Sequence, residues 1–228
     1  MNHLFRGLAG SRDAMSPRMK ALFKDLAYGQ SPELLVFTCS DSRMLPALTG
    51  GDQPGSIFVV RSVGNIVAPA DATGKSIGDV SEASAIEYAV EVLGIRDIAV
   101  CGHSNCGAMG AVLKGRHSFR DKAPNLVEWL AHADAHPGHT PVELVFPPNL
   151  SEADRLSQMN VLRQLDHVAS YFPVKSRKDE VKLHALWFDI GHAMLQLYEP
   201  DQRRFVPLDE AEILRLLTPP QGVSARGG

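Results

Sequence analysis

Short runs of apolar residues alternate with segments of helical periodicity along the first half of the chain. The apolar runs, at 34–38, 57–60 and 97–101, are too short for helices and are typical of strands buried on both faces. Between them, residues 81–93 have apolar positions at helical spacing and end at a glycine. Strands that alternate with helices predict a parallel sheet with helical crossovers.

The chain before residue 34 and after residue 101 predicts further helices and strands. Helices are expected at 15–28, 107–113, 124–135, 151–169 and 208–217, and strands at 142–146, 181–190 and 194–198, the last two as a hairpin. The predicted fold is therefore α/β, with a central, mostly parallel sheet flanked by helices and a C-terminal strand hairpin. No linker or repeat divides the sequence, so we expect one domain over 1–228, with an N-terminal helical arm at 1–29 and a loose tail at 218–228.

Composition narrows the classes of function. The 228 residues carry a net charge of −3 without a basic run, which argues against nucleic acid as a partner. No apolar run approaches the ~20 residues of a membrane-spanning helix, and the first residues lack the apolar core of a signal peptide. Three cysteines, an odd and low number, are typical of a reducing compartment. We expect a cytoplasmic protein with no membrane partner.

Two polar motifs follow predicted strands. Cys39-Ser40-Asp41-Ser42-Arg43 comes after the first apolar run, and His103-Ser104-Asn105-Cys106 comes after the third. Ligands of open α/β sheets bind beyond the carboxyl ends of the strands, where both motifs fall. Two thiolates and one imidazole suit Zn²⁺, and three protein ligands leave a fourth position for water. We therefore predict one catalytic zinc per chain, held by Cys39, His103 and Cys106.

The neighbouring charged residues predict how such a zinc would act. Zn²⁺ lowers the pKa of a bound water from ~15.7 towards ~7. Asp41 can accept a hydrogen bond from the resulting hydroxide and orient it, while Arg43 holds Asp41 ionised in a bidentate pair. Because two thiolates leave the site formally neutral, the water should ionise at somewhat higher pH than beside three imidazoles.

Other candidate ligands receive a plainer interpretation. Cys101 lies within the third apolar run and is expected to be a buried hydrophobe. His132, His136 and His139 stand in a polar, loop-like stretch and are expected to be solvated surface residues. We predict no second metal, and no proton shuttle can be assigned from the sequence.

The two motifs resemble the signature of the β-class carbonic anhydrases, Cys-Ser-Asp-Ser-Arg followed by Gly-His-Ser-x-Cys-Gly. The resemblance covers about residues 22–198 and includes Phe58 to Asn65, with Ser62 in place of the usual Asn, and Ala85 to Val90. It implies reversible hydration of CO₂ to bicarbonate, with zinc ligands at Cys39, His103 and Cys106 and the catalytic dyad at Asp41 and Arg43.

The plant-type branch of this family is the closest in pattern. In that branch the substrate-pocket residues match Gln30, Phe58, Val63 and Tyr88. Residues matching Gln30, Phe58 and Tyr88 reach the zinc of a neighbouring subunit, which implies a homodimer or a multiple of dimers. Other bacterial members use a Trp at the position of Val36 to close the site, so we expect Asp41 to stay paired and the zinc site to stay open.

Two alternatives remain at this point. The chain could hydrolyse a CO₂ analogue, carbonyl sulfide or carbon disulfide, on the same zinc site, and parallel assays with both substrates would separate these activities. It could also be a zinc-bearing bicarbonate sensor or scaffold with little turnover. The Asp41–Arg43 pair argues against a scaffold, which has no use for it.

Overall fold

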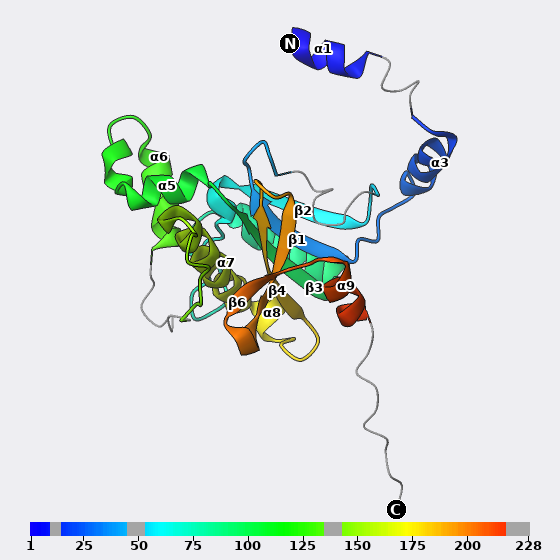
Figure 1. The fold of residues 1–228 in the computed structure, drawn as a ribbon. Coiled ribbons are helices and arrows are strands. Elements are labelled where there is room, and N and C mark those ends of the chain that lie inside the picture. Colours follow the sequence, from blue (N-terminus) through cyan, green and yellow to red (C-terminus); the bar gives the residue numbers. More distant parts are fainter. Residues whose placement is uncertain (10–14, 45–52, 135–142, 218–228) are drawn as a thin grey trace, which may run out of the picture.

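A six-stranded sheet forms the centre of the molecule (Figure 1), as a computed structural model that describes residues 1–9, 15–44, 53–134 and 143–217 shows. The strand order is β2-β1-β3-β4-β5-β6. The strands are β1 (Leu34–Cys39), β2 (Ile57–Ser62), β3 (Asp97–His103), β4 (Lys182–Asp189), β5 (Met194–Glu199) and β6 (Arg204–Pro207). The first four strands are parallel to one another, and the pairings of β4 with β5 and of β5 with β6 are antiparallel, which confirms the predicted mostly parallel sheet and its C-terminal hairpin.

Eight α-helices are described, of which α1 and α3 precede the sheet and the others follow or connect its strands. They are α1 (Asn2–Leu8), α3 (Pro17–Leu26), α4 (Val80–Glu87), α5 (Gly107–Leu113), α6 (Pro124–Leu130), α7 (Glu152–Ser170), α8 (Phe172–Lys175) and α9 (Glu210–Leu217). A π-helical turn, Tyr88–Val92, continues α4. In the described residues, no helix combines the length and apolar character needed to span a bilayer.

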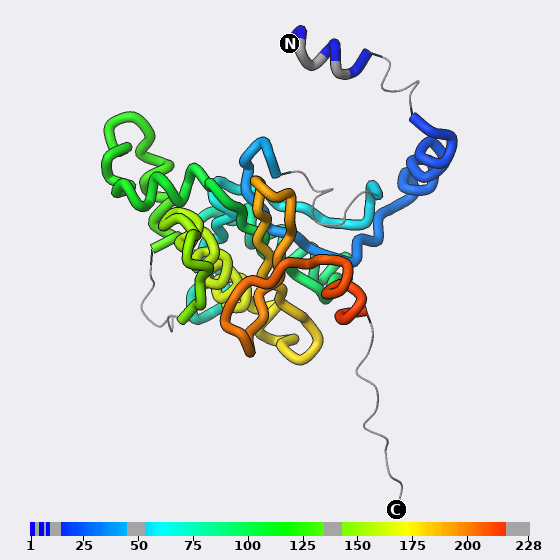
Figure 2. Tube along the Cα trace, in the orientation of Figure 1, coloured from blue at the N-terminus to red at the C-terminus, as the bar shows by residue number. Residues whose placement is uncertain are grey.

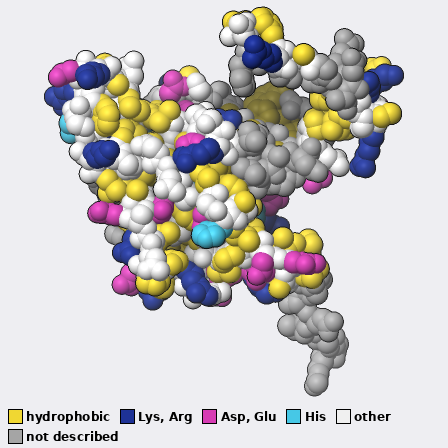
Figure 3. Space-filling model, turned by 45° about the horizontal axis from the view of Figure 1, so that its top comes forward, with side chains coloured by type: hydrophobic (Ala, Val, Ile, Leu, Met, Phe, Trp, Pro, Cys, Tyr) yellow, Lys and Arg dark blue, Asp and Glu magenta, His cyan; other side chains and the backbone are white. Residues whose placement is uncertain are grey.

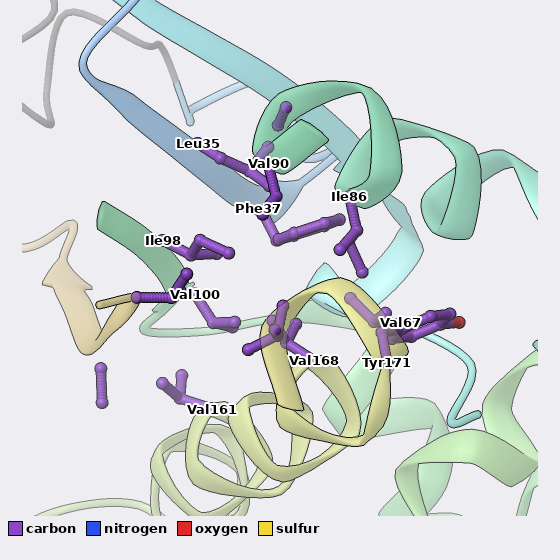
Figure 4. Close-up of a cluster of buried hydrophobic side chains, with 14 of the residues drawn as sticks. Leu35, Phe37, Val67, Ile86, Val90, Ile98, Val100, Val161, Val168 and Tyr171 are labelled. Carbon is purple, nitrogen blue, oxygen red and sulfur yellow. The ribbon is translucent and has the colours of Figure 1, made fainter. Parts of the chain in front are cut away.

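Two apolar clusters lie on opposite faces of the sheet. Leu35 and Phe37 of β1 pack with Ile98 and Val100 of β3 against α4 and α7 (Figure 4). The alternating residue Val36 belongs to the second cluster, on the other face. Successive side chains of a strand point to opposite faces, so the continuous apolar runs of β1 and β3 are explained by burial on both sides.

The N-terminal arm stands apart from the sheet, as the trace in Figure 2 shows. In α3, the Oγ of the N-cap Ser16 accepts a hydrogen bond from Met19 N (3.1 Å), and Pro17 occupies the first turn. None of the residues of α3 is buried, and Phe23 is 47% exposed. The predicted helix is thus confirmed, and in the described residues its apolar side chains are at most partly covered. That residues 1–228 form one domain stays a prediction.

One predicted strand is wrong. Residues 143–146 form no strand, and their one backbone bond to another segment is from Val145 N to Arg203 O (2.8 Å). Two consecutive prolines follow, and they remove the donors that a ladder would need. The partner segment instead forms β6, which was not predicted because it is short and ends in proline. The predicted tail at 218–228 lies outside the described residues.

Candidate metal centre

The ends of two neighbouring strands bring the predicted ligands together. β1 and β3 are paired in parallel, with Thr38 opposite Cys101, so Cys39 and His103 leave the sheet at the same edge. Cys106 follows one turn later as the N-cap of α5. The ligand atoms of Cys39, His103 and Cys106 lie within 4.8 Å of one another, and all three residues are buried. This is the one such group of possible metal ligands among the described residues.

The imidazole of His103 is oriented for a ligand. Its Nδ1 lies 2.9 Å from the carbonyl oxygen of Ser104, which fixes that nitrogen as the donor. Its Nε2 is buried and has no hydrogen-bond partner in the described part of the chain. A buried nitrogen of this kind is unfavourable unless it is paired. A cation held by Nε2 and the two sulfur atoms would pair it, so the residues present fit a metal ion.

The two cysteines form a coupled pair. Hydrogen bonding from the Cys106 thiol lowers the pKa of Cys39 to about 4, with help from the backbone N–H groups of Asp41 and Gly64, each 3.4 Å from its sulfur. The pKa of Cys106 is raised because its proton bonds to the Cys39 thiolate. A cation that binds both sulfur atoms as thiolates would displace the proton that the pair shares.

Asp41 and Arg43 form a bidentate pair beside these ligands. Arg43 donates from Nε to Asp41 Oδ1 (2.8 Å) and from Nη2 to Oδ2 (2.7 Å). These bonds hold the pKa of Asp41 well below its usual range. Asp41 Oδ2 lies 3.9 Å from His103 Nε2, close to the ligand cluster. Arg43 also donates to Asn105 O (3.1 Å), which ties the first motif to the second.

The predicted pocket residues fall into two groups. Val63 is 44% exposed and directly precedes Gly64, whose N–H bonds to Cys39, so it lies at the metal centre of its own chain. Phe58 pairs with Leu35, four residues before Cys39, which places it roughly 13 Å along the sheet at ~3.3 Å per residue.

Tyr88 and Gln30 belong to the distant group. The ring of Tyr88 lies 6.0 Å from that of Phe58, and Gln30 is exposed ahead of β1, at the strand end opposite Cys39. The structure therefore brings Phe58 and Tyr88 together but keeps them away from the metal ligands of their own chain.

The other residues singled out in the sequence have ordinary surroundings. Cys101 is fully buried in β3, and burial raises the pKa of its thiol to about 12, in agreement with the predicted core role. His132 packs edge-on against Trp129, with ring centroids 5.9 Å apart. His136 and His139 lie outside the described residues.

Several residues at this centre were missed by the sequence analysis. Arg61 donates to Cys39 O (3.2 Å) and to Asp41 O (2.7 Å) and so holds the first motif from β2. Asp154 of α7 accepts a hydrogen bond from Asn105 N (2.6 Å). Arg61 falls within the segment that carries the family resemblance, which was a usable signal. For Asp154 the only signal was its place three residues after the N-cap.

Comparison with known proteins identifies the family. The family model described as carbonic anhydrase matches residues 34–195. A carbonic anhydrase of Pseudomonas aeruginosa is 40% identical over 87% of this chain and 87% of its own, and one of Synechocystis is 33% identical over 90% and 74%. The solved β-carbonic anhydrase CcaA superposes with a TM-score of 0.77 at 31% identity, covering 92% of each chain. The chain is therefore an enzyme of the carbonic anhydrase family and belongs to its β class.

Proposed function

We propose that this protein catalyses the reversible hydration of CO₂ to bicarbonate and a proton, with one Zn²⁺ per chain held by Cys39 Sγ, His103 Nε2 and Cys106 Sγ. The observation that carries the proposal is the buried, unpartnered Nε2 of His103, which faces two sulfur atoms. Thiolate and imidazole ligands together select zinc over the oxygen-loving Mg²⁺ and Ca²⁺. Reduced thiolates also agree with a cytoplasmic location, which we propose on that ground.

Bound zinc supplies a Lewis acid that makes water a nucleophile at neutral pH. The chain supplies the orientation. Asp41 Oδ2 lies near the ligand cluster and can accept a hydrogen bond from the attacking water, which aims the lone pair of the water at the carbon of CO₂. Arg43 occupies both oxygens of Asp41, so the carboxylate stays ionised and fixed in rotation. A carboxylate that stays paired with Arg43 in this way would leave a position on the metal free for water.

The substrate pocket requires a second copy of the chain. Val63 lines the side of the pocket beside the metal, while Phe58, Tyr88 and Gln30 lie at the opposite strand end of the same chain. We propose that these three residues complete the site of a neighbouring subunit, as the plant-type pattern implies. Solved β-carbonic anhydrases of Sordaria macrospora, 26% identical to this chain with a TM-score of 0.57, are tetrameric.

The surface supports this assembly. The arm exposes Phe5 (57%), Leu8 (58%) and Phe23 (47%), and Figure 3 shows apolar side chains gathered on it. Exposed apolar groups in such numbers are typical of an interface. We propose that the arm packs on a neighbouring subunit in a dimer or a multiple of dimers.

Mixing two inactive variants tests the shared site. Cys39→Ala removes a metal ligand, and Tyr88→Ala removes a pocket wall. Co-expressed in one cell, the two variants form mixed dimers in which one of the two sites has both its ligand and its neighbour's Tyr88. Hydration activity should return in the mixed dimers and be absent from either variant alone. Sedimentation of the wild type as a fully active monomer, or no recovered activity, would contradict a shared site.

Metal content and turnover measured on the same sample test the proposal as a whole. We expect one zinc per chain and rapid CO₂ hydration, with slower hydrolysis of carbonyl sulfide. Faster hydrolysis of carbonyl sulfide than hydration of CO₂ would favour the analogue hydrolase. Full zinc without turnover of either substrate would favour a bicarbonate sensor. Zero or two equivalents of zinc after dialysis would contradict the assigned ligands.

A further inference from the structure

Helix α7 buries an unusual polar stripe. Asp154, Ser157, Asn160 and Gln164 follow one another at spacings of three or four residues and therefore share one face. Their exposed fractions are 8%, 1%, 1% and 0%. A helix normally turns apolar residues towards the core. Polar side chains that are buried to this degree need specific partners.

The partners are backbone groups of the segment that carries His103 and Cys106 and of the turn after β2, which contacts the sulfur of Cys39. Asp154 Oδ1 accepts from Asn105 N (2.6 Å), and Ser157 Oγ donates to His103 O (2.8 Å). Asn160 Nδ2 donates to the carbonyl oxygen of Gly64 (3.0 Å). Three successive turns of one helix thus reach three points around the metal centre.

Each of these points controls a different part of the centre. Gly64 N donates to the sulfur of Cys39, and Asn105 O accepts from the Arg43 guanidinium that holds Asp41. Asn105 lies between His103 and Cys106 and has a φ of 53°, which only a minority of non-glycine residues adopt. A backbone in this conformation persists when its surroundings hold it there.

Further hydrogen bonds hold the side chains of this stripe in place. Asn160 Oδ1 accepts from Gln164 Nε2 (2.9 Å), and Gln164 Oε1 accepts from Val67 N (2.9 Å). Ser157 Oγ accepts from the indole Nε1 of the buried Trp187 (3.1 Å). Such supporting bonds leave Ser157 and Asn160 little rotational freedom.

We propose that Asp154, Ser157 and Asn160 are positioning residues, which hold the ligand loops so that Cys39, His103, Cys106 and Asp41 keep their relative geometry. The inference deepens the proposed function and depends on it for the identity of the metal. We expect the largest effect from Asp154, because it holds the N–H of Asn105. Asn105 lies between the ligands His103 and Cys106, and its carbonyl oxygen accepts from Arg43.

Substitutions at Asp154 test this role with readouts that a purely structural role would not move. Asp154→Ala removes the acceptor, whereas Asp154→Asn keeps an oxygen for Asn105 N and a second group for Ser151 Oγ. Ser170→Ala is the control, because Ser170 makes equivalent backbone bonds on the same helix far from the ligand loops. For each protein we would measure the rate of zinc transfer to a chelator, the visible spectrum of the Co²⁺ form, the thermal midpoint and the turnover number.

We expect Asp154→Ala to release zinc about 10-fold faster or more and to alter the Co²⁺ spectrum, in line with other residues that orient metal ligands. Asp154→Asn should stay near the wild type. Ser170→Ala should lower the thermal midpoint without changing the spectrum or the release rate. If Asp154→Ala does not fold, Asn160→Asp, which keeps the acceptor for Gln164 Nε2 but replaces the donor to Gly64 O by an acceptor, should show the same faster release.

Wild-type spectra and release rates in folded Asp154→Ala, or in Asn160→Asp where Asp154→Ala does not fold, would overturn the proposal. These readouts are independent of turnover. A wild-type protein that binds Co²⁺ and zinc but does not hydrate CO₂ would refute the proposed function while leaving the positioning role in place.

Discussion

Replacing Gly64 by alanine should damage the metal centre through the backbone. Gly64 has a φ of 75°, its N–H donates to Cys39 Sγ at 3.4 Å, and its carbonyl oxygen accepts from Asn160. A Cβ at this position would lie 2.9 Å from the Cβ of Ala108 and 3.3 Å from side-chain atoms of Ile66 and Met109. The Cβ of Ala108 is attached rigidly to α5, so it cannot move without the helix.

The expected loss of stability has two parts. The left-handed conformation costs an L-residue about 1–2 kcal/mol. Overpacking against Ala108 adds about 1–3 kcal/mol, because the close contact cannot be relieved by rotating a side chain. The sum for Gly64→Ala is roughly 2–5 kcal/mol in the free energy of unfolding. Moving the Gly64 peptide should also weaken its bond to the Cys39 sulfur and speed the release of zinc.

Gly94→Ala provides a matched control. Gly94 has a φ of 73°, but a Cβ there would meet no atom within 4 Å. It should therefore pay only the conformational cost, about 1–2 kcal/mol, and keep its zinc. Denaturant unfolding of both variants gives the free energies, and transfer to a chelator gives the zinc release rates. The reasoning is refuted if Gly64→Ala is no less stable than Gly94→Ala, or if it releases zinc at the wild-type rate.

Three further predictions concern single side chains. Asp41→Asn should keep its zinc but lose turnover by on the order of 10²–10³-fold, because the amide no longer forms the charged pair with Arg43. Metal analysis beside a CO₂ hydration assay checks this prediction. Near-normal turnover would show that Asp41 has no part in the mechanism. Cys106→Ser should lose zinc because an alcohol is a poor ligand, whereas Cys101→Ala should retain it; equal zinc in both variants would contradict the ligand set. Burial raises the pKa of Glu82, whose Oε2 has no partner in the described chain. The folded protein therefore favours the protonated carboxyl, and this stabilisation is lost as the pH rises from ~4.3, the pKa of an unperturbed Glu, through the raised pKa of the folded state. Glu82→Met should therefore stabilise the fold by about 1–3 kcal/mol at pH 8 and by less at pH 4.5 in urea unfolding, and an equal effect at both pH values would be evidence against this account.

The sequence predicted that Cys39, His103 and Cys106 lie together because these residues coincide with regular structure. Cys39 and His103 end apolar runs, and the carboxyl ends of paired parallel strands meet at one edge. The pairing of Asp41 with Arg43 is equally local, since the two residues are two apart and bond within one turn. Local patterns of this kind survive in a single sequence without knowledge of the tertiary contacts.

The residues that the sequence did not reveal act across long distances in the chain. Asn160 bonds to Gly64, and Asp154 bonds to Asn105. The sequence predicted a helix at 151–169, but periodicity shows which residues share a face and not where that face points. The short strand β6 was not predicted for a related reason. Its pairing with β5 depends on the preceding turn, in which Arg203 adopts a left-handed conformation.

The parallel pairing of β1 and β3 has a consequence for folding kinetics. Two ligands of the metal centre lie at the ends of these strands, and the chain between them contains β2 and the crossover helix α4. No pair of strand-end ligands is adjacent before this long-range pairing, so a cation meets its full set of donors only in the nearly native chain. Contacts that are absent from the transition state slow unfolding and leave the folding rate unchanged. A bound metal ion should therefore slow unfolding and lengthen the lifetime of the native protein without speeding its formation.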